Sequence, residues 1–148
     1  MCEQQPIHAT LVEINGKGVL LRGRSGAGKS DLALRLIECK GAILVADDMV
    51  ILASEEGRLI GLAPDNLRGL LEVRGVGIVQ MPFAPKAAVD LIVDVTEDAK
   101  NIERMPKDAQ ESILGVEIKR IDLYAKENSA PEKVMIKLFG SLLNDTAL

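Results

Sequence analysis

Residues 23–30 of this 148-residue chain read Gly-Arg-Ser-Gly-Ala-Gly-Lys-Ser, and no other segment limits the possible folds as much. The octapeptide fits the phosphate-loop pattern Gly, any four residues, Gly-Lys-Ser/Thr, in which glycines let backbone N–H groups turn toward phosphate oxygens. Such a loop needs a buried strand before it and a helix after it. Residues 18–22 (GVLLR) predict the strand, and the apolar spacing within residues 31–40 predicts a helix that Gly41 ends.

The loop predicts a site for a nucleotide or polyphosphate such as ATP. Lys29 is expected to reach the β- and γ-phosphates, and the Ser30 hydroxyl is expected to bind Mg²⁺. The residues expected to surround the phosphates are Gly23, Arg24, Ser25, Gly26, Ala27, Gly28, Lys29 and Ser30.

The rest of the chain alternates strand and helix patterns, so we expect a single α/β domain over residues 1–148. Ser129 and Glu132 form a capping-box pattern at the start of a last helix, whose apolar face would carry Met135, Leu138, Phe139 and Leu142. The other predicted elements are strands at 7–14, 42–46, 87–95 and 117–123, a hairpin of residues 49–53 and 58–62, and a short helix at 64–70.

Composition excludes several classes of protein. The net charge of −4 and the presence of only Phe83, Phe139 and Tyr124 as aromatic residues argue against a nucleic-acid-binding surface. No apolar run is long enough to span a membrane, and the first residues do not resemble a signal peptide. Two cysteines far apart in sequence predict a reducing, cytoplasmic location.

Asp47 and Asp48 directly follow the apolar run at 42–46. Ligands of open α/β sheets gather at the carboxyl ends of strands, where both Gly23 and Asp47 are expected. One carboxylate could bind Mg²⁺ and its neighbour could accept a proton from a hydroxyl group. An acidic pair after a strand is also a common turn or helix cap, but the phosphate loop nearby favours a function.

Residues 70–80 contain Gly75 and Gly77 within an apolar run, just after Glu72 and Arg74. Without further information this pattern favours a β-bulge with one exposed ion pair. On their own, His8 is typical of a strand edge and Arg104 of an ordinary surface position.

Taken together, these segments resemble a known family. In their order and spacing, four features resemble the catalytic domain of HPr kinase/phosphorylase. They are His8, GRSGAGKSD at 23–31, LVADD at 44–48 and LEVRGVGIV at 71–79. The resemblance covers residues 7–121 and fits the last helix more loosely. It implies an α/β phosphate-loop fold related to phosphoenolpyruvate carboxykinase, with a mixed sheet, flanking helices and assembly into homohexamers.

The resemblance also implies an activity. It implies a protein-serine kinase that phosphorylates the phosphocarrier protein HPr, or a paralogue, with ATP or pyrophosphate and Mg²⁺. The resemblance further implies that inorganic phosphate reverses the reaction and that the enzyme regulates the sugar phosphotransferase system. Glu72 would join Ser30 at Mg²⁺, and His8 would lie in the active site. Asp48 is favoured over Asp47 as the proton acceptor, with both kept open.

Other residues are carried over in the same way. Arg104 would neutralise charge on the transferred phosphoryl group, and residues 71–80, including Arg74, Gly75 and Gly77, would serve both directions of the reaction. His8 lies almost at the start of the sequence, so we expect the form of the family that lacks an N-terminal domain.

The sequence departs from the family at residues 122–133, which read DLYAKENSAPEK. A Pro-Val-Arg-Pro-Gly-Arg-like loop linked to dephosphorylation has no clear counterpart there. We therefore expect kinase activity and leave phosphorolysis open. An ATP-sensing regulatory module without phosphoryl transfer is the alternative, although a binding module would not need the acidic pair.

Overall fold

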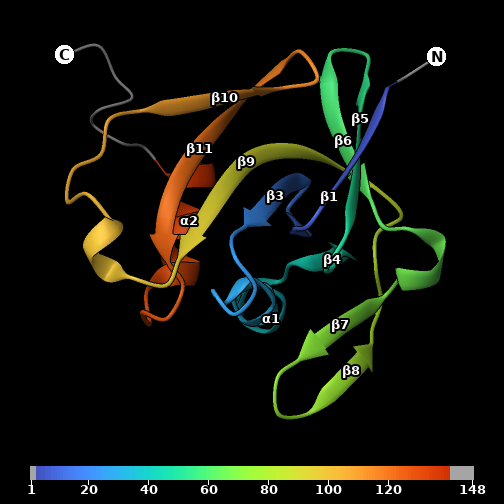
Figure 1. Ribbon diagram of the computed structural model, residues 1–148, viewed down its shortest axis with the longest axis horizontal. Coiled ribbons are helices and arrows are strands. Elements are labelled where there is room, and N and C mark those ends of the chain that lie inside the picture. Colours follow the sequence, from blue (N-terminus) through green and yellow to red (C-terminus); the bar gives the residue numbers. More distant parts are fainter. Residues whose placement is uncertain (1–2, 141–148) are drawn as a thin grey trace.

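Three parallel strands form the centre of the computed structural model, which describes residues 3–140 (Figure 1). β3 (Lys17–Arg22) pairs with β9 (Ala87–Thr96), and β9 pairs with β11 (Val116–Tyr124), both in parallel. Gly18 to Leu21 of β3 are all buried, as expected for a strand covered on both faces.

Two further strands extend this sheet so that the phosphate loop and Asp47 share an edge. β2 (Thr10–Ile14) is antiparallel to β3, and β4 (Ile43–Ala46) is antiparallel to β2. β4 therefore runs in the direction of β3, and the carboxyl ends of both strands face the same way. On the other side, β10 (Ala109–Ile113) pairs with β11 in a hairpin.

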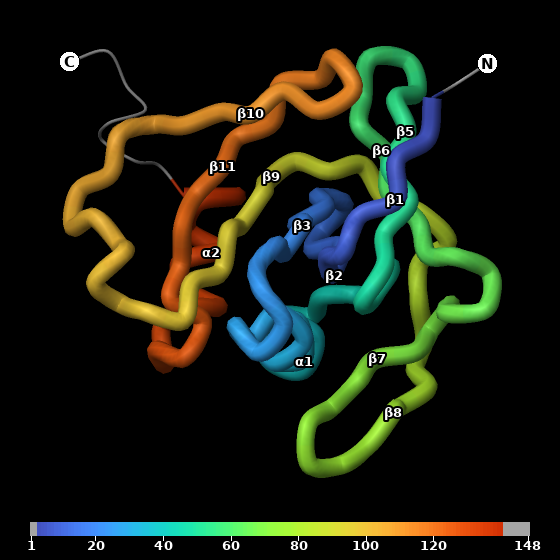
Figure 2. Tube along the Cα trace, viewed as in Figure 1, coloured from blue at the N-terminus to red at the C-terminus, as the bar shows by residue number. Residues whose placement is uncertain are grey.

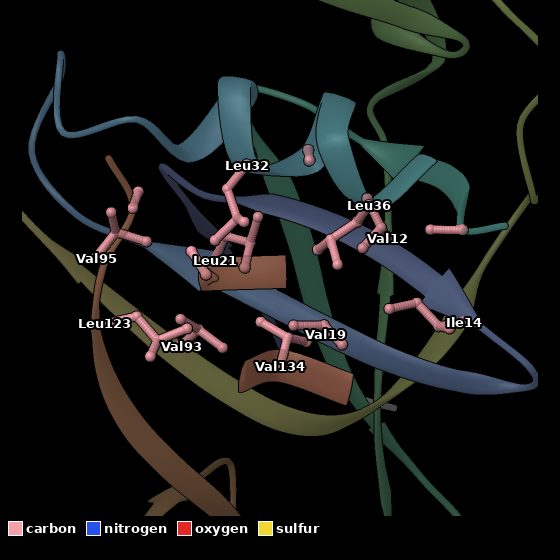
Figure 3. Packing of buried hydrophobic residues seen from close by; sticks show 14 of the residues in the cluster. Val12, Ile14, Val19, Leu21, Leu32, Leu36, Val93, Val95, Leu123 and Val134 are labelled. Atoms are coloured by element: carbon pink, nitrogen blue, oxygen red, sulfur yellow. The ribbon is translucent and has the colours of Figure 1, made fainter. Parts of the chain in front are cut away.

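Each face of the central strands is covered. α1 (Lys29–Lys40) and α2 (Ala130–Phe139) pack on one face, where Leu32, Leu36 and Val134 meet Val19, Leu21 and Val93 (Figure 3). The other face packs against β5 (Val50–Glu55) and β6 (Arg58–Leu62). β5 also pairs with β1 (Gln4–Ile7), and β6 pairs with the first residues of β9. No helix within residues 3–140 is both long and apolar enough to cross a membrane.

A separate two-stranded hairpin consists of β7 (Leu70–Val73) and β8 (Gly77–Gln80). It projects from the rest of the molecule (Figure 2). Leu71 is fully buried in the helix-side core, whereas Val76 and Ile78 are 77% and 73% exposed. The hairpin is therefore anchored at its base and open at its tip.

Several predicted elements need correction. The single strand expected at 7–14 is two strands, because the chain bends at His8 between β1 and β2. The short helix expected at 64–70 is only a turn of 3₁₀ helix, Asp65–Leu67. Ser129 precedes α2, but its side chain makes no capping hydrogen bond, so the capping box is wrong. Leu142, expected on the apolar face of this helix, lies outside the described residues.

Other expectations are confirmed, and three strands were missed. The 50–62 hairpin, the long strand β9 and the end of α1 at Gly41, with φ of 72°, lie where the sequence predicted them. A 3₁₀ turn, Ala99–Asn101, and the strands β7, β8 and β10 were not among the predicted elements. β10 has the sequence AQESI, which is too polar to stand out.

Candidate active site

The phosphate loop connects the carboxyl end of β3 to the first turn of α1, as the sequence predicted. Gly26 and Gly28 have φ of 85° and 106°, values that residues with side chains rarely adopt. Gly23 is required for a second reason, since a Cβ there would lie 2.7 Å from the Val95 carbonyl oxygen of β9. Ala27 is 1% exposed and packs into the core, which fixes the loop against the sheet.

The Lys29 ammonium lies over this loop. Its Nζ atom donates to the carbonyl oxygens of Gly23, at 2.7 Å, and Arg24, at 3.2 Å. The side chain thus bends back from the first helical residue across the loop. A cation in this place, together with the positive end of the helix dipole, favours a bound polyanion.

Asp47 links three segments of the site. Its Oδ1 atom accepts hydrogen bonds from the hydroxyls of Thr10 and Ser30, both at 2.8 Å. Its Oδ2 atom accepts a 3.0 Å hydrogen bond from the backbone N–H of Glu72. Asp47 is 5% exposed, so its carboxylate positions the loop serine and the base of the β7–β8 hairpin.

Asp48 differs from its neighbour in every respect. Its side chain is exposed, and it makes no hydrogen bond or ion pair with residues 3–140. Its backbone has φ of 70°, and the N–H of Met49 donates to the carbonyl of Asp47 at 2.8 Å across it. This is a γ-turn, a strained conformation for a residue other than glycine. Strain of this kind is common at functional sites, and it turns the Asp48 carboxylate away from the core.

The β7–β8 hairpin brings Glu72 to Asp47, and the Glu72 side chain is exposed. Arg74, Gly75 and Gly77 lie farther out, toward the tip. Gly75 and Gly77 have φ of 86° and 133°, so the two glycines make the turn of a hairpin. The β-bulge with an exposed ion pair that the pattern favoured is not formed. β7 and β8 pair in an unbroken register, and the side chains of Glu72 and Arg74 make no hydrogen bond or ion pair with residues 3–140.

His8 lies at the bend before β2, two residues from Thr10. It lines a pocket of about 280 Å³ together with Arg22, Glu111 and Leu114. Because β2 and β3 are antiparallel, His8 sits near the carboxyl end of β3. The structure thus brings His8 to the same edge as the phosphate loop.

Sequence reasoning missed the ion-pair cluster beside His8. Arg22, the last residue of β3, donates from Nε to Asp94 Oδ1 at 2.8 Å and from Nη1 to Glu111 Oε2 at 2.7 Å. Hydrogen bonds from Arg22 lower the pKa of Glu111, and those to Glu111 and Asp94 raise the pKa of Arg22. Arg120 joins at 3.4 Å from Asp94. The alternation of charged and apolar residues in these strands was the available signal, but it does not tell which strands are neighbours.

Arg104 is not brought together with these groups by any contact. It lies exposed in the segment between the 3₁₀ turn Ala99–Asn101 and β10, which follows the carboxyl end of β9. Its side chain makes no hydrogen bond or ion pair with residues 3–140. Its predicted role in charge neutralisation stays a prediction.

The fold and the site define an α/β phosphate-loop protein with a mixed sheet and flanking helices. The family model described as HPr Serine kinase C-terminal domain matches residues 1–136. The chain therefore belongs to the family of HPr serine kinase C-terminal domains.

Individual relatives agree with this assignment. The chain is 40% identical over 111 residues to an HPr kinase/phosphorylase of Clostridium tetani, covering 75% of this chain and 36% of the relative. It is 37% identical over 128 residues to that of Geobacillus thermodenitrificans, covering 79% and 41%. The chain thus spans well under half the length of these curated relatives.

A solved structure matches over nearly its whole chain. It is the Hpr(Ser) kinase/phosphatase from Coxiella burnetii, with a TM-score of 0.79 and 27% sequence identity. The match covers 90% of this chain and 93% of the other. The expected α/β phosphate-loop fold is therefore confirmed.

Proposed function

We propose that this chain transfers the γ-phosphoryl group of ATP to a seryl hydroxyl of HPr or a paralogous phosphocarrier protein. The observation that carries the proposal is the contrast between two consecutive aspartates near the phosphate loop. Asp47 is buried and accepts a hydrogen bond from Ser30, whereas Asp48 is exposed and its side chain makes no hydrogen bond with residues 3–140. A module that only binds nucleotide needs the first carboxylate but not the second. Family membership and the named relatives supply the acceptor.

Phosphoryl transfer depends mainly on positioning and electrostatic stabilisation. In this scheme the phosphate loop and Lys29 hold the polyphosphate, and Asp48 accepts the proton of the seryl hydroxyl as its oxygen bonds to the γ-phosphorus. ADP leaves, and the products are phosphoserine and ADP. His8 and Arg104 are proposed to face the transferred group, and Arg74, Gly75 and Gly77 to help present the acceptor.

Mg²⁺ is the proposed metal. Within residues 3–140, no group of three or more His, Cys, Asp and Glu side chains is arranged to hold a metal by itself. Mg²⁺ is, however, usually held by one or two carboxylates together with substrate phosphates. Ser30, Asp47 and Glu72 provide oxygen donors next to the phosphate loop, so the residues fit the ion. When bound, Mg²⁺ would neutralise charge on the phosphates.

We further propose that the protein works in the cytoplasm as a homohexamer that contacts neither membrane nor nucleic acid. The exposed apolar side chains of Val76, Ile78 and Phe139 support a surface between copies. Light scattering coupled to size-exclusion chromatography tests this directly, since a monomer at micromolar concentration would contradict it.

The deciding experiment incubates the purified protein with HPr from the same cell, Mg²⁺ and γ-labelled ATP, followed by mass mapping of the modified residue. Phosphoserine on HPr, lost with Asp48→Asn, is the expected result. ATP binding without labelling would instead favour an ATP-sensing module. After ATP is removed, inorganic phosphate is added. Pyrophosphate release would show that the chain also works in reverse despite its altered residues 122–133.

A further inference from the structure

Arg35, on the second turn of α1, reaches across to the segment that follows β11. Its Nη1 atom donates to the carbonyl oxygen of Glu127 at 3.2 Å, and its Nη2 atom donates to the carbonyl oxygen of Ala125. These two carbonyls flank Lys126. One guanidinium therefore fixes the backbone on both sides of a single residue.

The fixed segment lies against the phosphate loop. Ala125 is 1% exposed, and a Cβ built on Gly28 would lie only 3.0 Å from the Ala125 methyl group. Gly28 caps the N-terminus of α1, which is the end that receives phosphate. Asp31 in the first turn of α1 pairs with Arg35 Nε at 3.2 Å, which orients the guanidinium from the same helix. The loop, the start of the helix and the segment after β11 thus form one packed unit.

Lys126 has an exposed side chain that makes no hydrogen bond or ion pair with residues 3–140. Its neighbour Glu127 pairs with Lys133 instead. The backbone that carries Lys126 is therefore held next to the phosphate loop, and the Lys126 ammonium has no carboxylate partner among the described residues.

We propose that Arg35 is a positioning residue that holds Lys126 beside the phosphate loop, and that the Lys126 ammonium contacts the phosphates of bound ATP or pyrophosphate. The proposal rests on the phosphate-binding part of the proposed function and not on the identity of the acceptor. Arginine suits the positioning role because its planar fork of donors bonds two carbonyls at once, which the single ammonium of lysine does less well.

The test measures the dissociation constants of Mg²⁺–ATP and of pyrophosphate by titration calorimetry on the full chain. Lys126→Ala is expected to weaken binding about tenfold, which corresponds to about 1.4 kcal/mol. Arg35→Ala is expected to weaken binding by a similar factor. The double variant should be no weaker than about tenfold, because Arg35 acts through Lys126. Lys119→Ala, which changes an exposed lysine in the first half of β11, is the matched control and should bind like wild type.

Two results would overturn the inference. Unchanged binding by Lys126→Ala, which changes an exposed side chain and should fold normally, removes the proposed contact. A hundredfold loss in the double variant would mean that the two residues act independently. Wild-type protein that binds ATP but does not label HPr contradicts only the proposed phosphoryl transfer to HPr, whereas failure to bind either probe contradicts both proposals.

Discussion

Asp47 and Asp48 are adjacent in sequence, but their carboxylates have opposite surroundings. The side chain of Asp47 points inward and accepts hydrogen bonds from Thr10, Ser30 and the Glu72 backbone. The left-handed backbone at Asp48 turns the second carboxylate outward. We therefore expect substitutions at the two positions to change different properties of the protein.

Asp48→Asn should abolish most phosphoryl transfer and leave nucleotide binding intact. A proton acceptor contributes roughly 10²–10⁴-fold to the rate, and the amide keeps the shape of the carboxylate without its basicity. Steady-state kinetics with HPr should show a fall in kcat, while calorimetry gives an unchanged dissociation constant for ATP. If kcat stays within a few-fold of wild type, Asp48 is not the base.

Asp47→Ala should lower the free energy of unfolding by about 1–3 kcal/mol, because two hydroxyls and one backbone N–H lose a buried acceptor. Urea unfolding followed by circular dichroism measures the change. Asp65→Ala is the control, since the Asp65 side chain is 92% exposed and, among residues 3–140, forms an ion pair only with Arg68. Equal stability of both variants would show that the hydrogen bonds of Asp47 contribute nothing net.

At the scale of elements, the β7–β8 hairpin depends on how its base is fastened. The N–H of Met81 donates to the carbonyl of Gly69 at 2.8 Å, and Leu71 is buried in the core. The N–H of Glu72 also donates to Asp47, and within residues 3–140 the two strands pair with no other strand. The position of Glu72 at the site is therefore set by the base of the hairpin and not by its tip.

Gly69→Ala should destabilise the protein more than Gly75→Ala. Both glycines have positive φ, 72° and 86°, so either alanine costs about 1–2 kcal/mol. Only at Gly69 would the added Cβ also lie 2.9 Å from the Met81 carbonyl oxygen and from Phe83. Hydrogen exchange over residues 70–80 should accelerate in Gly69→Ala, and equal exchange in both variants would contradict this account.

The elements that sequence predicted best are those with strong local patterns. β9 has nearly continuous aliphatic residues, and the end of α1 is marked by a glycine. β10 could not be found in this way, because AQESI forms a strand only through its pairing with β11. Ser129 and Glu132 have the right spacing for a capping box, but Glu132 pairs with Lys40 of α1 at 2.7 Å instead.

The same limit applies to the site. The phosphate loop, the acidic pair and Glu72 could be identified from motifs, yet their arrangement depends on contacts between distant segments. Thr10 and Asp47 are 37 residues apart, and Arg35 and Glu127 are 92 apart. No periodicity within one segment encodes such pairs, which is why the roles of Thr10 and Arg35 were not expected from sequence.

At the scale of the whole molecule, the cluster of Arg22, Asp94, Glu111 and Arg120 ties four strands together below the phosphate loop. Arg22 lowers the pKa of Glu111 beneath its ordinary value of 4.5 in the folded protein. The charged form of Glu111 therefore stabilises the fold above pH 4.5. This contribution is lost as the pH falls below 4.5 and through the lowered pKa.

Glu111→Gln should accordingly reduce the difference in stability between neutral and acidic solution. Urea midpoints at pH 7 and near pH 3 measure this difference. Glu117→Gln, an exposed carboxylate on β11 without an ion pair within residues 3–140, is the control and should keep the wild-type difference. An unchanged pH dependence in Glu111→Gln would contradict the linkage.

The parallel pairing of β3 with β9 also has a consequence for synthesis on the ribosome. Arg22 and its partner Asp94 are 72 residues apart, so the strand that presents the phosphate loop has no parallel neighbour until β9 has been translated. Pairing of such distant strands is slow, and apolar segments stay exposed to aggregation meanwhile. A nascent chain arrested before residue 87 should therefore not bind ATP, whereas a chain released after β11 should bind it. ATP binding would thus report when the parallel strands of this domain have paired.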